Sequence, residues 1–132
     1  MVIDTSAIIA VLREEPDHDR VVHRLSTAST VAIAAPTRVE LAVVLRRSLS
    51  RADERRAFTW LDDVGVVTVA FDSEHTAIAT NAYRDYGRGS GHPARLSFGD
   101  CFSYALAIAR DEPLLFVGDD FNHTDVQVAL QR

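Results

Sequence analysis

Residues 1–12 read MVIDTSAIIAVL, and this stretch sets the architecture expected for the chain. Three apolar residues run directly into Asp4, and a second apolar run follows Thr5 and Ser6. The first run predicts a short buried strand, and residues 5–13 predict a helix. Asp4 stands between them, either as the cap of that helix or as one wall of a charged site.

The rest of the chain continues the alternation of strand and helix. Further short strands are predicted at 31–34, 66–69 and 114–117, and the tail at 126–130 is a candidate edge strand. Helices are predicted at 17–25, 36–49, 52–64, 98–110 and from Asp72 or Ser73 to Tyr86, with a flexible glycine-rich loop at 87–95. This order predicts one α/β domain over 1–132, with a parallel sheet covered on both faces.

Composition excludes several classes of protein. The chain has 132 residues and a net charge of −5, and every basic residue is arginine, so lysine chemistry such as a P-loop or a Schiff base is ruled out. The acidic balance argues against broad nucleic-acid binding, although a local arginine patch is compatible with it. A single cysteine, Cys101, allows no internal disulfide and fits the cytoplasm. No apolar run approaches a membrane span, and no signal peptide precedes Asp4.

Several carboxylates lie next to predicted buried strands or in apolar helices, where an unpaired charge is unfavourable. Asp4 and Asp119 each follow a predicted strand, and the carboxyl ends of parallel strands share one edge of a sheet. Glu40 lies in an apolar helical stretch, VELAVVL, so we expect it to be partly buried and to face that edge. Asp100 lies in the first turn of a helix that is apolar nearly all round, where a charge needs a partner.

Converging carboxylates repel each other by about 3 kcal/mol for a pair ~5 Å apart at an effective dielectric of about 20, so a cation is the expected partner. Oxygen ligands favour Mg²⁺ or Mn²⁺, whereas the scattered histidines and lone cysteine disfavour zinc. Such a site fits phosphodiester hydrolysis, because the metal activates a water and stabilises the leaving oxygen. This chemistry alone does not separate RNA from DNA.

Four stretches of the chain, in order, resemble a PIN domain of the VapC toxin type. They are VIDTSAIIAVL, PTRVELAVVL, LSFGDCFSYALA and PLLFVGDDFNHTDV. The resemblance implies a PIN-like three-layer α/β/α fold with a central, mainly parallel sheet. It also implies Mg²⁺-dependent endoribonuclease activity, with Mn²⁺ as a substitute, a VapB-type antitoxin partner and a homodimer.

The resemblance assigns roles to four acids of this sequence. It implies a catalytic set of Asp4, Glu40, Asp100 and Asp119, with Asp4 and Asp100 as direct metal ligands. Glu40 would act through metal-bound water, and Asp120 is the alternative to Asp119. Three weaker candidates have competing structural roles, Asp125 as a turn residue and Ser6 and Ser97 as helix-start residues.

Two segments are candidate RNA contacts. Six arginines near Glu40 predict either a phosphate-binding rim or an ordinary solvated helix face. They are Arg38, Arg46, Arg47, Arg51, Arg55 and Arg56. The loop at 87–95 is read either as a flap over RNA or as a surface connection. The helices around Val43 and Leu61 are candidate surfaces for the homodimer or the antitoxin.

The sequence is also compatible with two alternative functions. A DNA-directed metal nuclease shares the chemistry, and a non-catalytic PIN-like RNA-binding or interaction module shares the fold. A receiver domain is disfavoured by the absence of lysine. A haloacid-dehalogenase-type phosphatase is disfavoured because Asp4-Thr5-Ser6 lacks its second aspartate.

Overall fold

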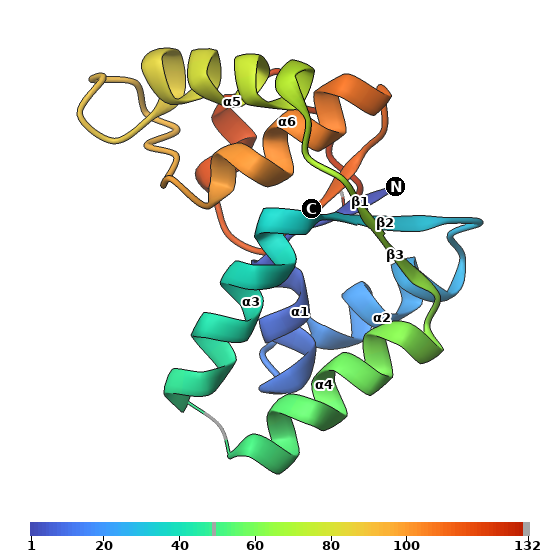
Figure 1. Cartoon of the computed structure of the whole chain (residues 1–132). Coiled ribbons are helices and arrows are strands. Elements are labelled where there is room, and N and C mark those ends of the chain that lie inside the picture. The colour runs from blue at the N-terminus through green and yellow to red at the C-terminus, as the bar shows by residue number, and fades with distance from the viewer. Residues whose placement is uncertain (49, 131–132) are drawn as a thin grey trace.

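In the computed structural model, which describes residues 1–48 and 50–130, a four-stranded sheet separates two groups of helices (Figure 1). The strands are β1 (Val2–Ile3), β2 (Val31–Ala34), β3 (Val66–Val69) and β4 (Leu114–Leu115). The helices are α1 (Thr5–Leu12), α2 (His18–Ser26), α3 (Ala35–Ser48), α4 (Arg51–Asp63), α5 (Ser73–Tyr86) and α6 (Asp100–Arg110), followed by a 3-10 turn, η1 (Asp120–His123). The predicted α/β class is confirmed.

The sheet is parallel throughout, with strand order β3-β2-β1-β4. The central strand β1 pairs on both sides, so that Val2 lies opposite Ala32 and Leu114. All four strands therefore point their carboxyl ends at the same edge. Asp4, the start of α3 and the turn after β4 meet at that edge, where open α/β sheets place their sites.

Alternating side chains build a core on each face of the sheet. Val2 and Ala32 pack with α5 and α6, whereas Ile3 and Ile33 pack with the layer formed by α1 to α4. Figure 1 shows the sheet between these two helical layers. Because both faces are covered at β1, β2 and β4, these strands are apolar at successive positions, as expected for a buried parallel sheet, whereas β3 at the sheet margin leaves Val67 exposed. The three-layer arrangement is confirmed.

The sheet edge beyond β4 departs from prediction. The strand predicted at 114–117 ends at Leu115, since the Val117 N–H donates to the Ser6 hydroxyl at 3.2 Å rather than to a strand. The candidate edge strand at 126–130 is reduced to one bridge beside β4, between Leu114 and Val128, in which the Leu114 N–H donates to Gln127 O and the Ala129 N–H donates to Leu114 O. The predicted helix at 98–110 begins at Asp100, two residues later than expected.

Helix ends mostly match their sequence signals. Asp72 caps α5, and its carboxylate accepts the N–H groups of Glu74 and His75. Asp17 precedes α2 without a capping bond, since its carboxylate pairs with Arg20 at 2.8 Å. α3 begins at Ala35, and residue 49, its predicted end, lies outside the described residues.

The glycine-rich segment at 87–95 is a loop, as predicted, and both its ends are tied to the core. The Leu96 N–H donates to Tyr86 O at 2.9 Å, and the Arg88 N–H donates to Leu96 O at 3.0 Å. Ala94 and Leu96 are fully buried. None of the helices in the described ranges is long and apolar enough to cross a membrane.

Candidate functional site

Asp4 combines the two roles that its sequence position allows. Its Oδ2 accepts the Ser6 N–H at 2.9 Å and the Ser6 hydroxyl at 2.7 Å, which caps α1. Its Oδ1 accepts the Ser103 hydroxyl at 2.6 Å. The side chain is only 4% exposed, so these bonds hold it in one orientation at the carboxyl end of β1. A carboxylate has about four lone-pair directions, so acceptor capacity remains on Oδ1.

Ser103 and Thr37 support Asp4 from two other helices, and the sequence analysis missed both. Ser103, on α6, is fully buried, and its hydroxyl lies 3.3 Å from that of Thr37 on α3. Spacing was the available signal, because Ser103 follows Asp100 by three residues and Thr37 precedes Glu40 by three. Residues three apart share a helix face.

Asp100 lies at the first turn of α6 and is half-buried. Its Oδ2 accepts the Ser97 N–H at 2.6 Å, and the Ser97 hydroxyl accepts the Asp100 N–H at 3.2 Å. This exchange is a reciprocal cap at the helix start. Ser97 and Ser6 thus have the helix-start roles that the sequence offered as one alternative for each. Oδ1 of Asp100 has no hydrogen-bond partner among the described residues.

The Glu40 carboxylate packs against the start of α6 at Gly99, which has no side chain. A Cβ built on Gly99 would lie 2.3 Å and 2.4 Å from the two carboxylate oxygens of Glu40. Gly99 has ordinary helical angles, φ −65° and ψ −40°, so the close approach, not the backbone conformation, requires glycine. Glu40 is partly buried, as predicted, although Val39 and Val43 beside it are exposed and its apolar sequence context was a poor guide.

The three carboxylates influence one another electrostatically. Burial raises the pKa of Glu40 from 4.5 to about 7, and the charges of Asp4 and Asp100 add to the shift. Burial also raises the pKa of Asp100, with a further contribution from the charge of Asp4, against the lowering effect of its hydrogen bonds to Ser97. The site therefore concentrates negative charge that its own residues do not neutralise.

This charge predicts a pH-dependent stability in the absence of metal. Between pH 4.5 and about 7 the folded protein holds a proton on Glu40 that the unfolded chain releases, so stability falls as pH rises through this window. Glu40→Gln removes that loss. In EDTA at pH 8 we expect the variant to be about 1 kcal/mol more stable than wild type, a value reduced for solvent screening of a half-exposed group. Thermal melts at pH 5 should show almost no difference, and an equal difference at both pH values would contradict this.

The turn after β4 carries three further acids in different surroundings. The charge of Asp120 contributes to the raised pKa of Asp100. Asp119 instead accepts the Asn122 side-chain N–H at 3.2 Å. Asp125 accepts the Tyr104 hydroxyl at 2.6 Å, which ties the tail to α6. The contacts of Asp125 are those of a structural residue, and the charge of Asp120 reaches Asp100.

The oxygen atoms of the site carboxylates fit a hard divalent cation, but within the described part of the chain these carboxylates do not form a closed cage of ligands. Asp4, Glu40 and Asp100 supply only oxygen, which Mg²⁺ and Mn²⁺ prefer. In residues 1–48 and 50–130, no three His, Cys, Asp or Glu side chains form a ready-made metal cluster. Next to Asp4, the buried Thr5 hydroxyl has no hydrogen-bond partner in this part of the chain. Two carboxylates completed by water are therefore a better fit than an all-protein cage.

The arginines near Glu40 divide into paired and unpaired groups. Arg38 pairs with Asp62 at 2.9 Å and stacks over Phe58, and Arg46 pairs with Glu54 at 3.3 Å. Arg56 pairs with Asp53 at 3.6 Å. The remaining three, Arg47, Arg51 and Arg55, are exposed and form no ion pair with the described residues. Only this second group is available for phosphates without breaking an ion pair.

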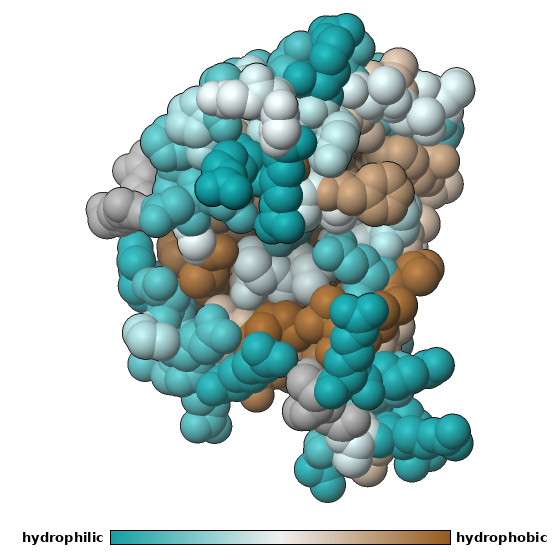
Figure 2. All heavy atoms as spheres, turned by 90° about the vertical axis from the view of Figure 1, so that its left-hand side faces the viewer, coloured by the Kyte–Doolittle hydropathy of each residue, from teal (hydrophilic) through white to brown (hydrophobic). Residues whose placement is uncertain are grey.

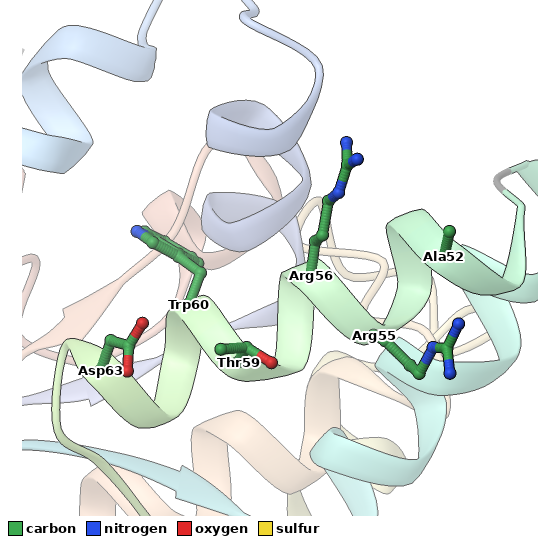
Figure 3. A pocket seen from close by; sticks show the side chains of 6 residues that line it. All are labelled: Ala52, Arg55, Arg56, Thr59, Trp60 and Asp63. Atoms are coloured by element: carbon green, nitrogen blue, oxygen red, sulfur yellow. The ribbon is translucent and has the colours of Figure 1, made fainter.

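A separate hollow of about 420 Å³ runs along the outer face of α4 (Figure 3). Trp60, Arg55 and Arg56 line it, and all its lining residues come from that one helix. The hollow belongs to α4, and none of the site carboxylates lines it. The Leu61 side chain is fully buried, so its helix would contribute to an interface through other residues, such as those that line this hollow, whereas Val43 is itself 47% exposed.

Comparison with known proteins identifies the family. The sequence model of the PIN domain matches residues 1–127, and the chain belongs to the PIN domain family. Within it, the chain is similar to proteins named VapC. Ribonuclease VapC42 of Mycobacterium tuberculosis is 45% identical over 129 residues, covering 98% of each chain. Ribonuclease VapC28 of the same organism is 44% identical over 132 residues, covering 100% of this chain and 99% of its own.

Solved structures share the fold at lower identity. VapC20 of Mycobacterium tuberculosis, described as a toxin that cleaves the sarcin-ricin loop, superposes with a TM-score of 0.77 at 16% identity. That match covers 99% of this chain and 98% of VapC20. A toxin–antitoxin complex from Klebsiella pneumoniae gives a TM-score of 0.70 at 15% identity, covering 94% and 92%.

Proposed function

We propose that this protein is a divalent-metal-dependent endoribonuclease and the toxin of a VapBC-type pair. The observation that carries the proposal is the electrostatic coupling of Asp4, Glu40 and Asp100 at one sheet edge. The names of its relatives, ribonucleases at 44–45% identity over nearly the whole chain, support the same reading.

Asp4 and Asp100 are the proposed metal ligands, because each is oriented by hydrogen bonds and keeps acceptor capacity on one oxygen. Bound Mg²⁺ or Mn²⁺ would provide Lewis-acid stabilisation of the phosphodiester and its leaving oxygen. Ser103 and Ser6 hold the Asp4 carboxylate in place. Glu40, with a pKa of about 7, can accept or hold a proton near neutral pH, which suits a residue that acts through water.

The fourth acid is proposed from the turn after β4. Asp119 was predicted there, with Asp120 as the alternative. We favour Asp120, because its charge contributes to the raised pKa of Asp100. Comparing the cleavage rates of Asp119→Asn and Asp120→Asn separates the two.

Matched RNA and DNA substrates test the proposed activity. Purified protein is incubated with a mixed structured RNA pool and with DNA of the same sequences, in Mg²⁺, in Mn²⁺ and in EDTA. Metal-dependent cleavage of RNA alone supports the proposal. Cleavage of DNA at a similar rate would favour the DNA-directed alternative, and binding of RNA without cleavage would favour a non-catalytic module.

We also propose a protein antitoxin and a homodimer, from two different surfaces. The Trp60 hollow on α4, with unpaired Arg55, fits a segment of a protein partner that carries apolar and acidic residues. On α3, Val39 and Val43 are 66% and 47% exposed one turn apart, which fits contact with a second copy. Co-purification with the product of an adjacent small reading frame tests the antitoxin, and light scattering tests the dimer.

Arg47 is the arginine of α3 best placed to meet the substrate. It follows Glu40 by seven residues and so lies on nearly the same face of the helix, about 10 Å along its axis. We expect Arg47→Ala to weaken RNA binding and to reduce the slope of log affinity against log salt by ~0.7. Arg46→Ala is the matched control, because Arg46 already pairs with Glu54. Equal salt slopes for the two variants would remove Arg47 from the RNA-binding surface.

A further inference from the structure

An aromatic pocket adjoins the acidic site and has no role in the chemistry described above. It lies between α5 and α6, with a volume of about 400 Å³. Its walls include Phe71, Tyr83, Phe98 and Phe102. Phe98 is 74% exposed and Tyr83 is 45% exposed. Large aromatic side chains left in water at a concave site mark a surface that another molecule covers.

The aromatic rings support one another, so the pocket is already formed. The Phe98 ring meets Phe102 edge to face with centroids 4.8 Å apart. Phe102 in turn meets Phe71 edge to face at 5.3 Å. Edge-to-face contacts of this kind stabilise each ring in its position. Phe98 therefore presents a ring held by its neighbour, with most of its surface free.

The pocket and the acidic site both include residues at the start of α6. Phe98, Gly99 and Asp100 are consecutive, and the Glu40 carboxylate packs against Gly99 between the ring and the acid. Cys101, the next residue, also lines the pocket. Figure 2 views the side where α3 and the start of α6 lie in Figure 1, and hydrophobic residues form a band across it. Phe98 and Cys101 of the pocket flank Gly99 and Asp100 in the chain, so the pocket and the acids lie at the same end of α6.

The pocket walls present apolar surface rather than a fixed set of hydrogen-bond donors. The Thr76 hydroxyl donates to Asp72 O at 2.8 Å, and the Thr80 hydroxyl donates to Thr76 O at 2.8 Å. Both threonine hydroxyls at the rim have therefore used their protons on the α5 backbone. Apart from the Tyr83 hydroxyl, the pocket therefore recognises a ligand mainly by stacking and shape, which tolerate any base.

We propose that this aromatic pocket binds one unpaired nucleobase of the RNA, next to the phosphate held at the acidic site. The inference rests on the proposed ribonuclease function and adds a substrate requirement to it. Single-stranded RNA is recognised by stacking of splayed bases on aromatic side chains. A base in this pocket orients the neighbouring phosphodiester at Asp100 and restricts cleavage to segments where that base is free to leave a helix.

Binding of short fluorescent oligoribonucleotides tests the inference. The parent protein is Asp100→Asn, so that the probe stays uncut, and the probes are an oligoadenylate and an abasic strand of equal length. Phe98→Leu keeps apolar bulk but removes the ring, and we expect it to bind oligoadenylate about tenfold more weakly. Phe98→Tyr keeps a ring and should bind within about twofold of the parent. On the abasic probe, Phe98→Leu and the parent should bind equally.

Four other outcomes can be told apart. Equal weakening on both probes would overturn the base pocket, as would no weakening on either. A fall in oligomeric mass of Phe98→Leu by light scattering would overturn it too, because the face would then be a seam between two copies. Failure of the parent to bind either probe would instead count against the proposed RNA function. Val67→Ala, an exposed apolar truncation on β3, is the matched control.

Discussion

Asp100→Asn is expected to lower RNA cleavage by ~10²–10³-fold or more, the loss that follows removal of one preorganised charged group from an active site. The substitution keeps an oxygen that can accept the Ser97 N–H, so the cap of α6 survives. It also removes a carboxylate whose pKa is raised by burial, so the metal-free protein should be no less stable than wild type. Cleavage rates and thermal melts on the same preparations measure both effects.

A matched control separates the site from general loss of charge. Asp85→Asn removes an exposed carboxylate that pairs with Arg84 on α5, away from the strand ends. We expect it to cleave RNA at the wild-type rate. If Asp100→Asn were globally unfolded, the main role of Asp100 would be to cap α6. If Asp100→Asn were folded and active, Asp100 would be excluded from the metal site.

Gly99→Ala is expected to reduce cleavage about 10²-fold while leaving the fold intact. The added methyl group would occupy the space of the Glu40 carboxylate, whose oxygens lie 2.3 Å and 2.4 Å from that position. Gly99 already has helical backbone angles, which alanine adopts readily. The carboxylate ends a flexible side chain, so it moves away at little cost in stability, and the loss falls on catalysis.

A double-mutant cycle tests this reading of Gly99. In a Glu40→Ala background the methyl group meets no carboxylate, so Gly99→Ala should cause almost no further loss of activity. Circular dichroism and melting temperature confirm that each variant is folded. Additive losses in the double variant would mean that the methyl group harms the site in some way other than by displacing Glu40.

Most of the fold could be predicted from local sequence signals. The strands at 31–34 and 66–69 were located to the residue, because Thr30 and Gly65 mark their starts and both strands contain β-branched residues. The errors cluster at β4, where LLFV has the composition of a longer strand. The Val117 N–H instead donates to the Ser6 hydroxyl, across 111 residues of sequence. A partner that distant leaves no local signal.

The acids of the site were predictable as residue types, and their supports were not. A carboxylate inside an apolar stretch stands out, as Asp4 and Asp100 do. Ser103 and Thr37 are common in helices, and only the crossing of α3 and α6 brings their hydroxyls to within 3.3 Å. Gly99 likewise gains its role from a side chain on another helix. The distinction between Asp119 and Asp120 depends on which way the turn after β4 presents each carboxylate, which neighbouring sequence does not encode.

The most direct test of the central claim is anomalous diffraction from crystals of the protein soaked in Mn²⁺. We expect a peak bonded to carboxylate oxygens of Asp4 and Asp100, at the ~2.0–2.2 Å typical of a small divalent cation, with water completing its shell. The same peak should be absent from crystals of Asp100→Asn. A Mn²⁺ ion bound elsewhere on the surface, or no bound ion at concentrations that support RNA cleavage, would contradict the assignment of these acids as the metal site.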